Sequence, residues 1–286
     1  MESRAGRHGR FLLPLVTGTV ERMAYRRFSL FPESPTLRDM FSKQSIRYQW
    51  RGNGPVITTA ILIVCVAVWL IELLLSIVAP SALNTLVGFG AFQPMLAVSR
   101  PWTFITSMFL HQPTSILHIL FNMLTLWSVG PMLERLMGHW PFLALYMLSG
   151  IGGGMGMMLW GALAPGQAGW FTAAYGASGA LFGLFAAVLI VYRRIGADIT
   201  SMLVWMVINF LMPVVVRNVA WQAHVGGFLI GALLTWLLVS GLHVFRGKSL
   251  AYRSMVYGAS VFVLMVVVIL LCNLSNPIGW MLQMFH

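Results

Sequence analysis

The sequence has 286 residues, of which 58% are hydrophobic and only 9% are charged, and its mean hydropathy is +0.82. Because a soluble globular domain carries about a quarter charged residues, this composition excludes an ordinary soluble core. Uncharged apolar runs of about 20 residues recur instead, and that length crosses a bilayer as a helix. We therefore expect an all-α membrane protein, a polytopic helical bundle with tails.

The net charge of +11 is interpreted from the position of the basic residues. Ten of the eighteen Lys and Arg residues precede residue 54, and most of the others lie in short gaps between apolar runs. This pattern is typical of the cytoplasmic loops of a membrane protein. No basic stripe with interleaved aromatic residues accompanies it, so we predict no nucleic-acid partner. Cys65 and Cys272 each lie within an apolar run, which argues against a disulfide framework.

Seven uncharged runs are predicted to span the membrane, with edges defined to within several residues. They are residues 56–78, 116–132, 142–163, 175–192, 199–216, 221–244 and 255–272. The interval 79–115 is too long for a tight turn and too apolar for a solvated loop. We expect it to lie partly in the bilayer interface, packed on protein.

The basic residues also predict the orientation. With the N-terminus inside and each span crossing once, 16 Lys and Arg residues fall inside and two, Arg100 and Arg217, fall outside. This asymmetry places the N-terminus in the cytoplasm and the C-terminus, after an odd number of spans, outside the cell. The apolar piece from Phe11 to Val16 is too short for a secretory signal, so residues 1–54 are interpreted as a basic cytoplasmic tail.

Glu72 is the one acidic residue deep inside a predicted span. An ionisable residue in that position can be functional. Alternatively, it lies near the outer end of the first span and reaches the interface or a polar neighbour.

Ser178 and His224 are polar residues at the starts of the fourth and sixth predicted spans. Taken alone, a serine among small residues, as in the run Gly-Ala-Ser-Gly that begins at Gly176, is usually a helix-packing device. A single histidine inside the membrane can equally be a hydrogen-bonded structural residue or a base.

Glycines near both residues favour the chemical interpretation. Gly179 and Gly183 on the fourth span, and Gly227 and Gly231 on the sixth, form two faces of small residues at every fourth position. If these faces meet, the two helix axes approach closely and the serine hydroxyl comes within reach of the imidazole. Serine needs a base at that distance to act as a nucleophile.

His118 and Asn122 are four residues apart, so both lie on one face of the second span. Their N–H groups are suited to stabilise the negative charge that develops on a carbonyl oxygen during acyl transfer. The alternative is that they bind the second span to its neighbours. No carboxylate has a spacing that suggests a third triad member, and Glu134 lies at the opposite end of the second span. The sequence therefore predicts a dyad.

Metal chemistry is not favoured by the sequence. It contains no HExxH motif, and its seven histidines are scattered over both sides of the predicted membrane. We predict no metal and no cofactor.

Three motifs resemble those of the rhomboid intramembrane serine proteases, and the resemblance extends over about residues 56–243. They are HILFN from His118, GASG from Gly176 followed by Phe182 and Gly183, and AHVGG from Ala223 followed by Gly231. The segment Trp102-Thr103 is similar to the family's Trp-Arg motif, with Thr103 where the arginine usually stands.

The resemblance implies that Ser178 is the nucleophile and His224 its general base. It further implies that His118, Asn122 and the Ser178 backbone N–H are oxyanion donors. The cavity would be filled with water and open to the extracellular side, and the substrates would be single-span helices cut near that face. Lipid would be the other partner. The protein would be a multi-pass protein of a bacterial-type plasma membrane.

The expected organisation is a tail at 1–54, a six-helix catalytic core at 55–245 and a segment at 246–286. That last segment holds a basic loop, a seventh helix and a short extracellular tail, which gives a rhomboid-like 6+1 arrangement. The alternatives are a catalytically silent relative that binds transmembrane clients, a transporter or channel, and a structural scaffold. A transporter needs polar residues through both leaflets, whereas here they gather at one depth. The sequence predicts no oligomeric state.

Overall fold

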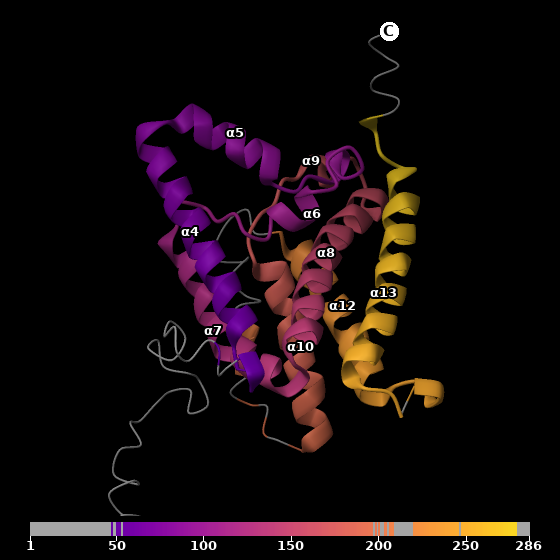
Figure 1. The fold of residues 1–286 in the computed structure, drawn as a ribbon. Coiled ribbons are helices and arrows are strands. Elements are labelled where there is room, and N and C mark those ends of the chain that lie inside the picture. The colour runs from indigo at the N-terminus through magenta and orange to yellow at the C-terminus, as the bar shows by residue number, and fades with distance from the viewer. Residues whose placement is uncertain are drawn as a thin grey trace, which may run out of the picture. The chain divides into compact units, whose positions relative to one another are not determined.

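A computed structural model of the chain describes residues 54–196, 220–245 and 247–278, with residues 47, 50–52, 198, 200, 203, 204 and 206–208 besides (Figure 1). The structural statements below concern these residues. Their secondary structure is helical, apart from one isolated antiparallel bridge between Phe92 and Ala174.

Five of the described helices are long and apolar enough to cross a membrane. They are α4 (Val56–Val78), α7 (Ile116–Met137), α8 (His139–Leu163), α12 (Trp221–Ser240) and α13 (Leu250–Asn273). A further long helix, α10 (Ser178–Ile195), lies among them. The prediction of an all-α polytopic bundle is confirmed. The predicted span 199–216 lies largely outside the described residues.

The helix ends differ from several predicted spans. Some differ because charge lies inside a helix, whereas α12 ends four residues before its predicted end, ahead of Gly241 with its φ of +60°. The first span matches α4 at both ends. In contrast, α7 continues past residue 132 through Glu134 and Arg135, and α8 begins at His139. A search for uncharged runs stops at such residues, whereas backbone hydrogen bonding does not. Gly138, with a φ of +86°, makes the one-residue turn between α7 and α8.

The helices α8, α10 and α12 pack closely on one another. Residues 179–188 of α10 are all buried, as expected for a helix that is apolar on every side and surrounded by others. A Cβ on Gly227 would overlap the carbonyl oxygen of Gly179, and one on Gly231 would overlap the backbone of Gly183. The predicted contact between the two glycine faces is therefore confirmed.

The helix α8 approaches this pair in the same way. A Cβ on Gly156 would meet the backbone of Gly226 on α12, and one on Gly183 of α10 would overlap the side chain of Ser149 on α8. Three helices thus meet at distances that only glycine allows, which fixes their relative positions within narrow limits.

The interval between α4 and α7 is folded rather than extended. It contains α5 (Pro80–Gly90), the 3₁₀ turn η1 (Pro94–Leu96) and the short helix α6 (Thr103–Thr106). Figure 1 shows α5 turning away from the end of α4 and leading back toward α6. Phe89 and Trp102 stack with ring centroids 5.0 Å apart, and both are exposed, as suits aromatic residues at a membrane interface.

Three side chains close the C-terminal end of α5. Arg100 Nη1, Trp102 Nε1 and Thr106 Oγ1 donate to the carbonyls of residues 88, 89 and 90, at 2.9, 3.0 and 2.7 Å. The last carbonyls of a helix need such partners where water is scarce. Thr103, at the usual arginine position, is buried and donates to the carbonyl of Arg100 at 2.7 Å. Arg100, three positions earlier, is the residue whose guanidinium bonds to the end of α5.

Glu134 joins the beginnings of α4 and α8 to the end of α7. Its fully buried carboxylate accepts hydrogen bonds from the backbone N–H of Ile57 and of Thr58 and from the Thr58 hydroxyl, at 2.8, 2.8 and 2.7 Å. It also contacts His139 Nδ1 at 2.6 Å. A carboxylate at a helix N-terminus satisfies unpaired amides and complements the helix dipole.

The last helix, α13, packs on α8 and α12 and is tied at both ends. Arg253 donates to the carbonyl of Leu238 near the C-terminal end of α12, where a cation is electrostatically favoured. At the other end, Asn276 Nδ2 donates to the carbonyl of Met95 in η1 at 2.9 Å. The C-terminal part of the chain therefore holds the loop between α4 and α7.

The glycine contact between α10 and α12 predicts a large cost for the smallest possible side chain. Gly227→Ala should lower the thermal unfolding temperature in detergent, because the new methyl group meets backbone and overpacking costs about 1–3 kcal/mol. Gly88→Ala on α5 is the matched control. A Cβ there meets nothing within 4 Å, so the higher helix propensity of alanine should leave stability equal or raised. Equal stability of the two variants would contradict the packing.

Candidate active site

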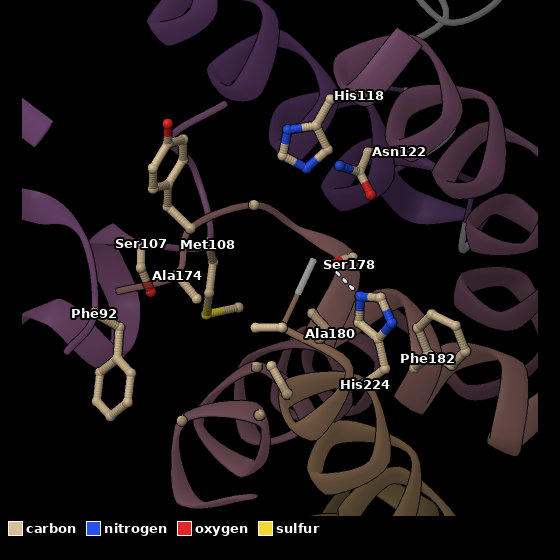
Figure 2. A pocket seen from close by; sticks show the side chains of 18 of the residues that line it. Phe92, Ser107, Met108, His118, Asn122, Ala174, Ser178, Ala180, Phe182 and His224 are labelled. Atoms are coloured by element: carbon tan, nitrogen blue, oxygen red, sulfur yellow. Dashed lines mark hydrogen bonds between the residues drawn. The ribbon is translucent and has the colours of Figure 1, made fainter. Parts of the chain in front are cut away.

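A cavity of about 360 Å³ lies where the N-terminal ends of α7, α10 and α12 come together (Figure 2). All four residues that the sequence predicts for the site, Ser178, His224, His118 and Asn122, line it. The remaining wall comes from α8, from neighbouring residues of α7, α10 and α12, and from the segments that precede these three helices. The structure thus brings together side chains that are up to 106 positions apart in the sequence.

The backbone before Ser178 requires glycine. Ser178 is the first residue of α10, and the chain reaches it through Gly176, whose φ is +132°. A residue with a side chain rarely adopts that conformation. The N–H of Gly176 donates to the carbonyl of Ser107 at 2.8 Å, which fixes the turn against α6.

Ser178 and His224 are in direct contact. The distance from Ser178 Oγ to His224 Nε2 is 2.9 Å, and the His224 side chain is 4% exposed. The Ser178 hydroxyl donates to Nε2 when the ring carries its own proton on Nδ1. Phe182, one helical turn after Ser178, stacks on the imidazole with centroids 4.3 Å apart and planes 13° apart. In Figure 2 the His224 ring lies between Ser178 and Phe182.

His118 and Asn122 present their donors to the backbone in front of Ser178. His118 Nδ1 accepts from the N–H of Gln112 at 3.4 Å, so the ring proton lies on Nε2. Asn122 Nδ2 is buried and has no hydrogen-bond partner. A Cβ on Gly176 would lie 2.8 Å from His118 Nε2 and 3.8 Å from Asn122 Nδ2. The missing side chain of Gly176 therefore leaves space in front of both donors.

The loop that precedes Ser178 is hydrogen-bonded to the interval between α4 and α7. Phe92 and Ala174 exchange two backbone hydrogen bonds, of 2.9 and 2.8 Å, and Gln93 Nε2 donates to the carbonyl of Phe171 at 3.2 Å. With the bond from Gly176, four contacts tie the two loops together. The cavity wall therefore depends on the interval between α4 and α7, although the four site residues lie elsewhere.

Carboxylates lie near the bundle core, but none contacts the histidine of the pair. Among the described residues, Glu72 bonds to the backbone of His111, and Glu134 lies at the far end of α7. No hydrogen bond in this part of the chain joins a carboxylate to His224. The same residues contain no cluster of three or more His, Cys, Asp or Glu side chains arranged to hold a metal ion.

Three contributions to the site were not predicted from the sequence. Phe182 was noted in a motif, and its spacing of four from Ser178 could have indicated that it faces the same partner. The space left by Gly176 requires the coordinates, because a positive φ is not visible in a sequence. Gln112 acts through its backbone N–H, which carries no sequence signal.

Comparison with known proteins gives the family. The Rhomboid domain model matches residues 98–241, half of the chain. Rhomboid protease GluP of Bacillus subtilis is 35% identical over 157 residues, which cover 52% of this chain and 28% of that protein. RHOMBOID-like protein 5 of Arabidopsis thaliana is 32% identical over 166 residues, 55% of this chain and 51% of that protein. Rhomboid protease AarA of Providencia stuartii is 27% identical over 233 residues, 73% and 81% of the two chains.

The chain thus spans less than two thirds of the length of GluP and of the Arabidopsis protein. The matched segment 98–241 contains the helix pair whose glycines meet, and it contains the four candidate site residues, which line the cavity. It also lies within the interval over which the motifs resemble one family. On these grounds the chain belongs to the rhomboid family.

Proposed function

We propose that the protein is a serine endopeptidase that cleaves transmembrane helices of other membrane proteins within the bilayer. The observation that carries the proposal is the 2.9 Å contact between Ser178 Oγ and His224 Nε2. A serine hydroxyl becomes a useful nucleophile when a base lies at that distance. Polar groups inside an apolar bundle are costly, which favours a functional role for the pair. The names of GluP and AarA, both rhomboid proteases, agree with it.

In the proposed reaction, Ser178 Oγ attacks the carbonyl carbon of the scissile peptide bond while its proton passes to His224 Nε2. The tetrahedral intermediate collapses when His224 gives this proton to the leaving amine, and an acyl-serine ester remains. Water then attacks the ester and gives its proton to His224. The histidine returns the proton to Ser178 as the new carboxyl product leaves. Stacking on Phe182 would keep the ring in one plane throughout.

His118 and Asn122 are proposed to stabilise the oxyanion together with the backbone N–H of Ser178. Support comes from the unpaired, buried Asn122 Nδ2 and from the Nε2 proton of His118, both of which face the backbone of Gly176. A buried donor without a partner costs free energy in the resting protein. That cost is recovered when charge develops on the substrate oxygen.

The proposed substrates are single-span membrane proteins. Inside a bilayer a peptide backbone is helical, because its polar groups have no water to bind. A peptide bond must leave the helix to reach Ser178, so a substrate helix weakened by residues such as glycine is favoured. The wall beyond Ser178, formed by Phe104, Met108 and Met157 with glycines of α8, suits an extended segment without large polar groups.

The proposed setting is a bacterial-type plasma membrane, with a cytoplasmic tail at 1–54, a catalytic core at 55–245 and a segment at 246–286 that carries the additional helix. The 16 to 2 distribution of Lys and Arg supports a cytoplasmic N-terminus and an extracellular C-terminus. In this orientation the N-terminal ends of α7, α10 and α12, and with them the cavity, face the outside.

The dyad predicts that either member is indispensable. Ser178→Ala and His224→Ala should each lower cleavage of a helix-weakened transmembrane substrate by at least ~10⁴-fold, because water does not replace either group in the same geometry. A mechanism-based serine inhibitor should label the wild type at Ser178. Ser260→Ala, an exposed serine on α13, is the matched control and should retain activity. Cleavage by purified Ser178→Ala would contradict the proposal. If the wild type binds transmembrane proteins but does not cleave them, the alternative of a catalytically silent binding protein is favoured.

The oxyanion donors predict a smaller and separable loss. Asn122→Ala and His118→Ala should each lower kcat by something on the order of 10²-fold, with labelling of Ser178 by a small inhibitor still detectable. The nucleophile and base remain in both variants, so the defect should appear in turnover rather than in KM. Aggregation of both variants in detergent would instead support the helix-binding role of these side chains.

The proposed orientation predicts opposite results for reporters at two positions. Two kinds of reporter enzyme are compared at each position, one active only outside the cytoplasm and one active only inside it. After His286, only the first kind should be active. At Gly247, in the turn between α12 and α13, only the reporter that works inside the cytoplasm should be active. A cytoplasmic signal from the C-terminal fusion would show that the number of spans is even.

A further inference from the structure

Glu72 is buried on a helix whose other residues are mostly exposed or half-buried. Only 17% of the most apolar stretch of α4 is buried, yet the Glu72 side chain is fully buried. Thr58, Ile61, Cys65 and Glu72 are buried and follow one another at intervals of three, four and seven residues. These intervals place all four on one face of α4. The carboxyl group therefore faces the rest of the bundle rather than lipid. The polar neighbour considered from the sequence is present, and it lies in the loop before α7.

The Glu72 carboxylate holds one backbone amide of that loop. Glu72 Oε2 accepts from the N–H of His111 at 2.9 Å, and Oε1 has no partner. This bond joins residues 39 positions apart. A glutamate is an expensive way to satisfy one amide inside a membrane protein, because the desolvated second oxygen gains nothing in return.

The next amide along the chain reaches the oxyanion site. The N–H of Gln112 donates to His118 Nδ1 at 3.4 Å. Consecutive peptide groups therefore bind the carboxylate of α4 and the imidazole of α7. Since an accepting Nδ1 forces the ring proton onto Nε2, the position of this peptide determines whether His118 offers a donor to the substrate.

The side chain of His111 supports the same ring from one side. The His111 and His118 rings lie 5.3 Å apart with planes at 51°, and His111 is completely buried. Its Nδ1 lies 3.2 Å from the carbonyl of Phe109, which places the proton there. Burial, and then the nearby His118, lower the pKa of His111 to about 3, so it is neutral and supplies no charge to the site.

We propose that Glu72 is a positioning residue of the oxyanion site. Its carboxylate holds the N–H of His111, and the next peptide N–H, that of Gln112, bonds to His118 Nδ1 and fixes the tautomer and orientation of that ring. The inference rests on the proposed function, because it gives Glu72 a role in the same reaction. Glu72 does not reach the substrate itself. Without it the loop amide is free to move, Gln112 loses its hold on Nδ1, and the His118 proton can shift away from the oxyanion.

The test compares Glu72→Leu, which removes the acceptor, with Glu72→Gln, which keeps an amide oxygen for the His111 N–H. Both are made in the wild type and in His118→Ala, with Leu74→Ala, an exposed position on α4, as control. Turnover is normalised to the fraction of enzyme labelled at Ser178. Glu72→Leu should lower kcat about tenfold with little change in KM, less than the ~10² of a direct donor. Glu72→Gln should retain most activity, and Leu74→Ala all of it.

The decisive comparison is the double variant. If Glu72 acts through His118, Glu72→Leu should cost less than about twofold in the His118→Ala background, since coupled residues are not additive. Two results would overturn the inference. One is a full tenfold loss of kcat from Glu72→Leu in the His118→Ala background, and the other is a loss of kcat in Glu72→Gln as large as that in Glu72→Leu. Should cleavage persist in Ser178→Ala, the proposed function fails. If cleavage requires Ser178 but the two losses add, only the role of Glu72 fails.

A second measurement needs no variant at position 72. Selective ¹⁵N-histidine labelling in micelles distinguishes the two neutral tautomers of an imidazole, and the signal absent from His118→Ala assigns His118. The wild type should carry its proton on Nε2. A proton on Nδ1 would contradict the bond from Gln112 and overturn the inference even if Glu72→Leu does not fold.

Discussion

The close approach of α10 and α12 is the constraint on which the site depends. Each helix delivers one member of the Ser178–His224 pair, and neither side chain is long enough to compensate for a wider spacing between the backbones. Gly179 and Gly227 remove the atoms that would separate the helices, and α8 fits against both through its own glycines. Because small shifts of reacting groups cost large factors in rate, the proposed reaction depends on these glycines as much as on the pair itself.

The irregular segments follow a different rule, which is that no polar backbone group is left without a partner where water is scarce. The end of α5 receives side-chain donors, and the loop before Ser178 exchanges backbone bonds with the loop before α6. The same bonds that satisfy these groups also fix the cavity wall. The same hydrogen bonds therefore stabilise the loops and determine the geometry of the site. Asn276 in the C-terminal segment contributes through its bond to the carbonyl of Met95.

The sequence was most informative where a polar residue interrupts an apolar helix. It identified α4 to the residue, and it predicted His118, Asn122, Ser178 and His224, which the structure brings to one cavity. It could not predict the partners of Glu72 or Asn276, because these bonds join positions 39 and 181 apart and end on backbone atoms, which have no residue-specific pattern. The contributions of Gly176 and Arg100 likewise depend on backbone dihedrals and loop geometry that composition does not encode.

Two carboxyl groups bond α4 to the rest of the protein, one near each end of the helix. Near its start, Thr58 bonds to Glu134, and near its end Glu72 bonds to the loop before α7. Thr58 and Glu72 are fourteen positions apart, which corresponds to a rise of ~21 Å along the helix. A lipid-facing helix normally answers a change in bilayer thickness by tilting. With both ends bonded to the protein, α4 does not tilt independently of its neighbours, so a change in bilayer thickness acts on the bundle as a whole.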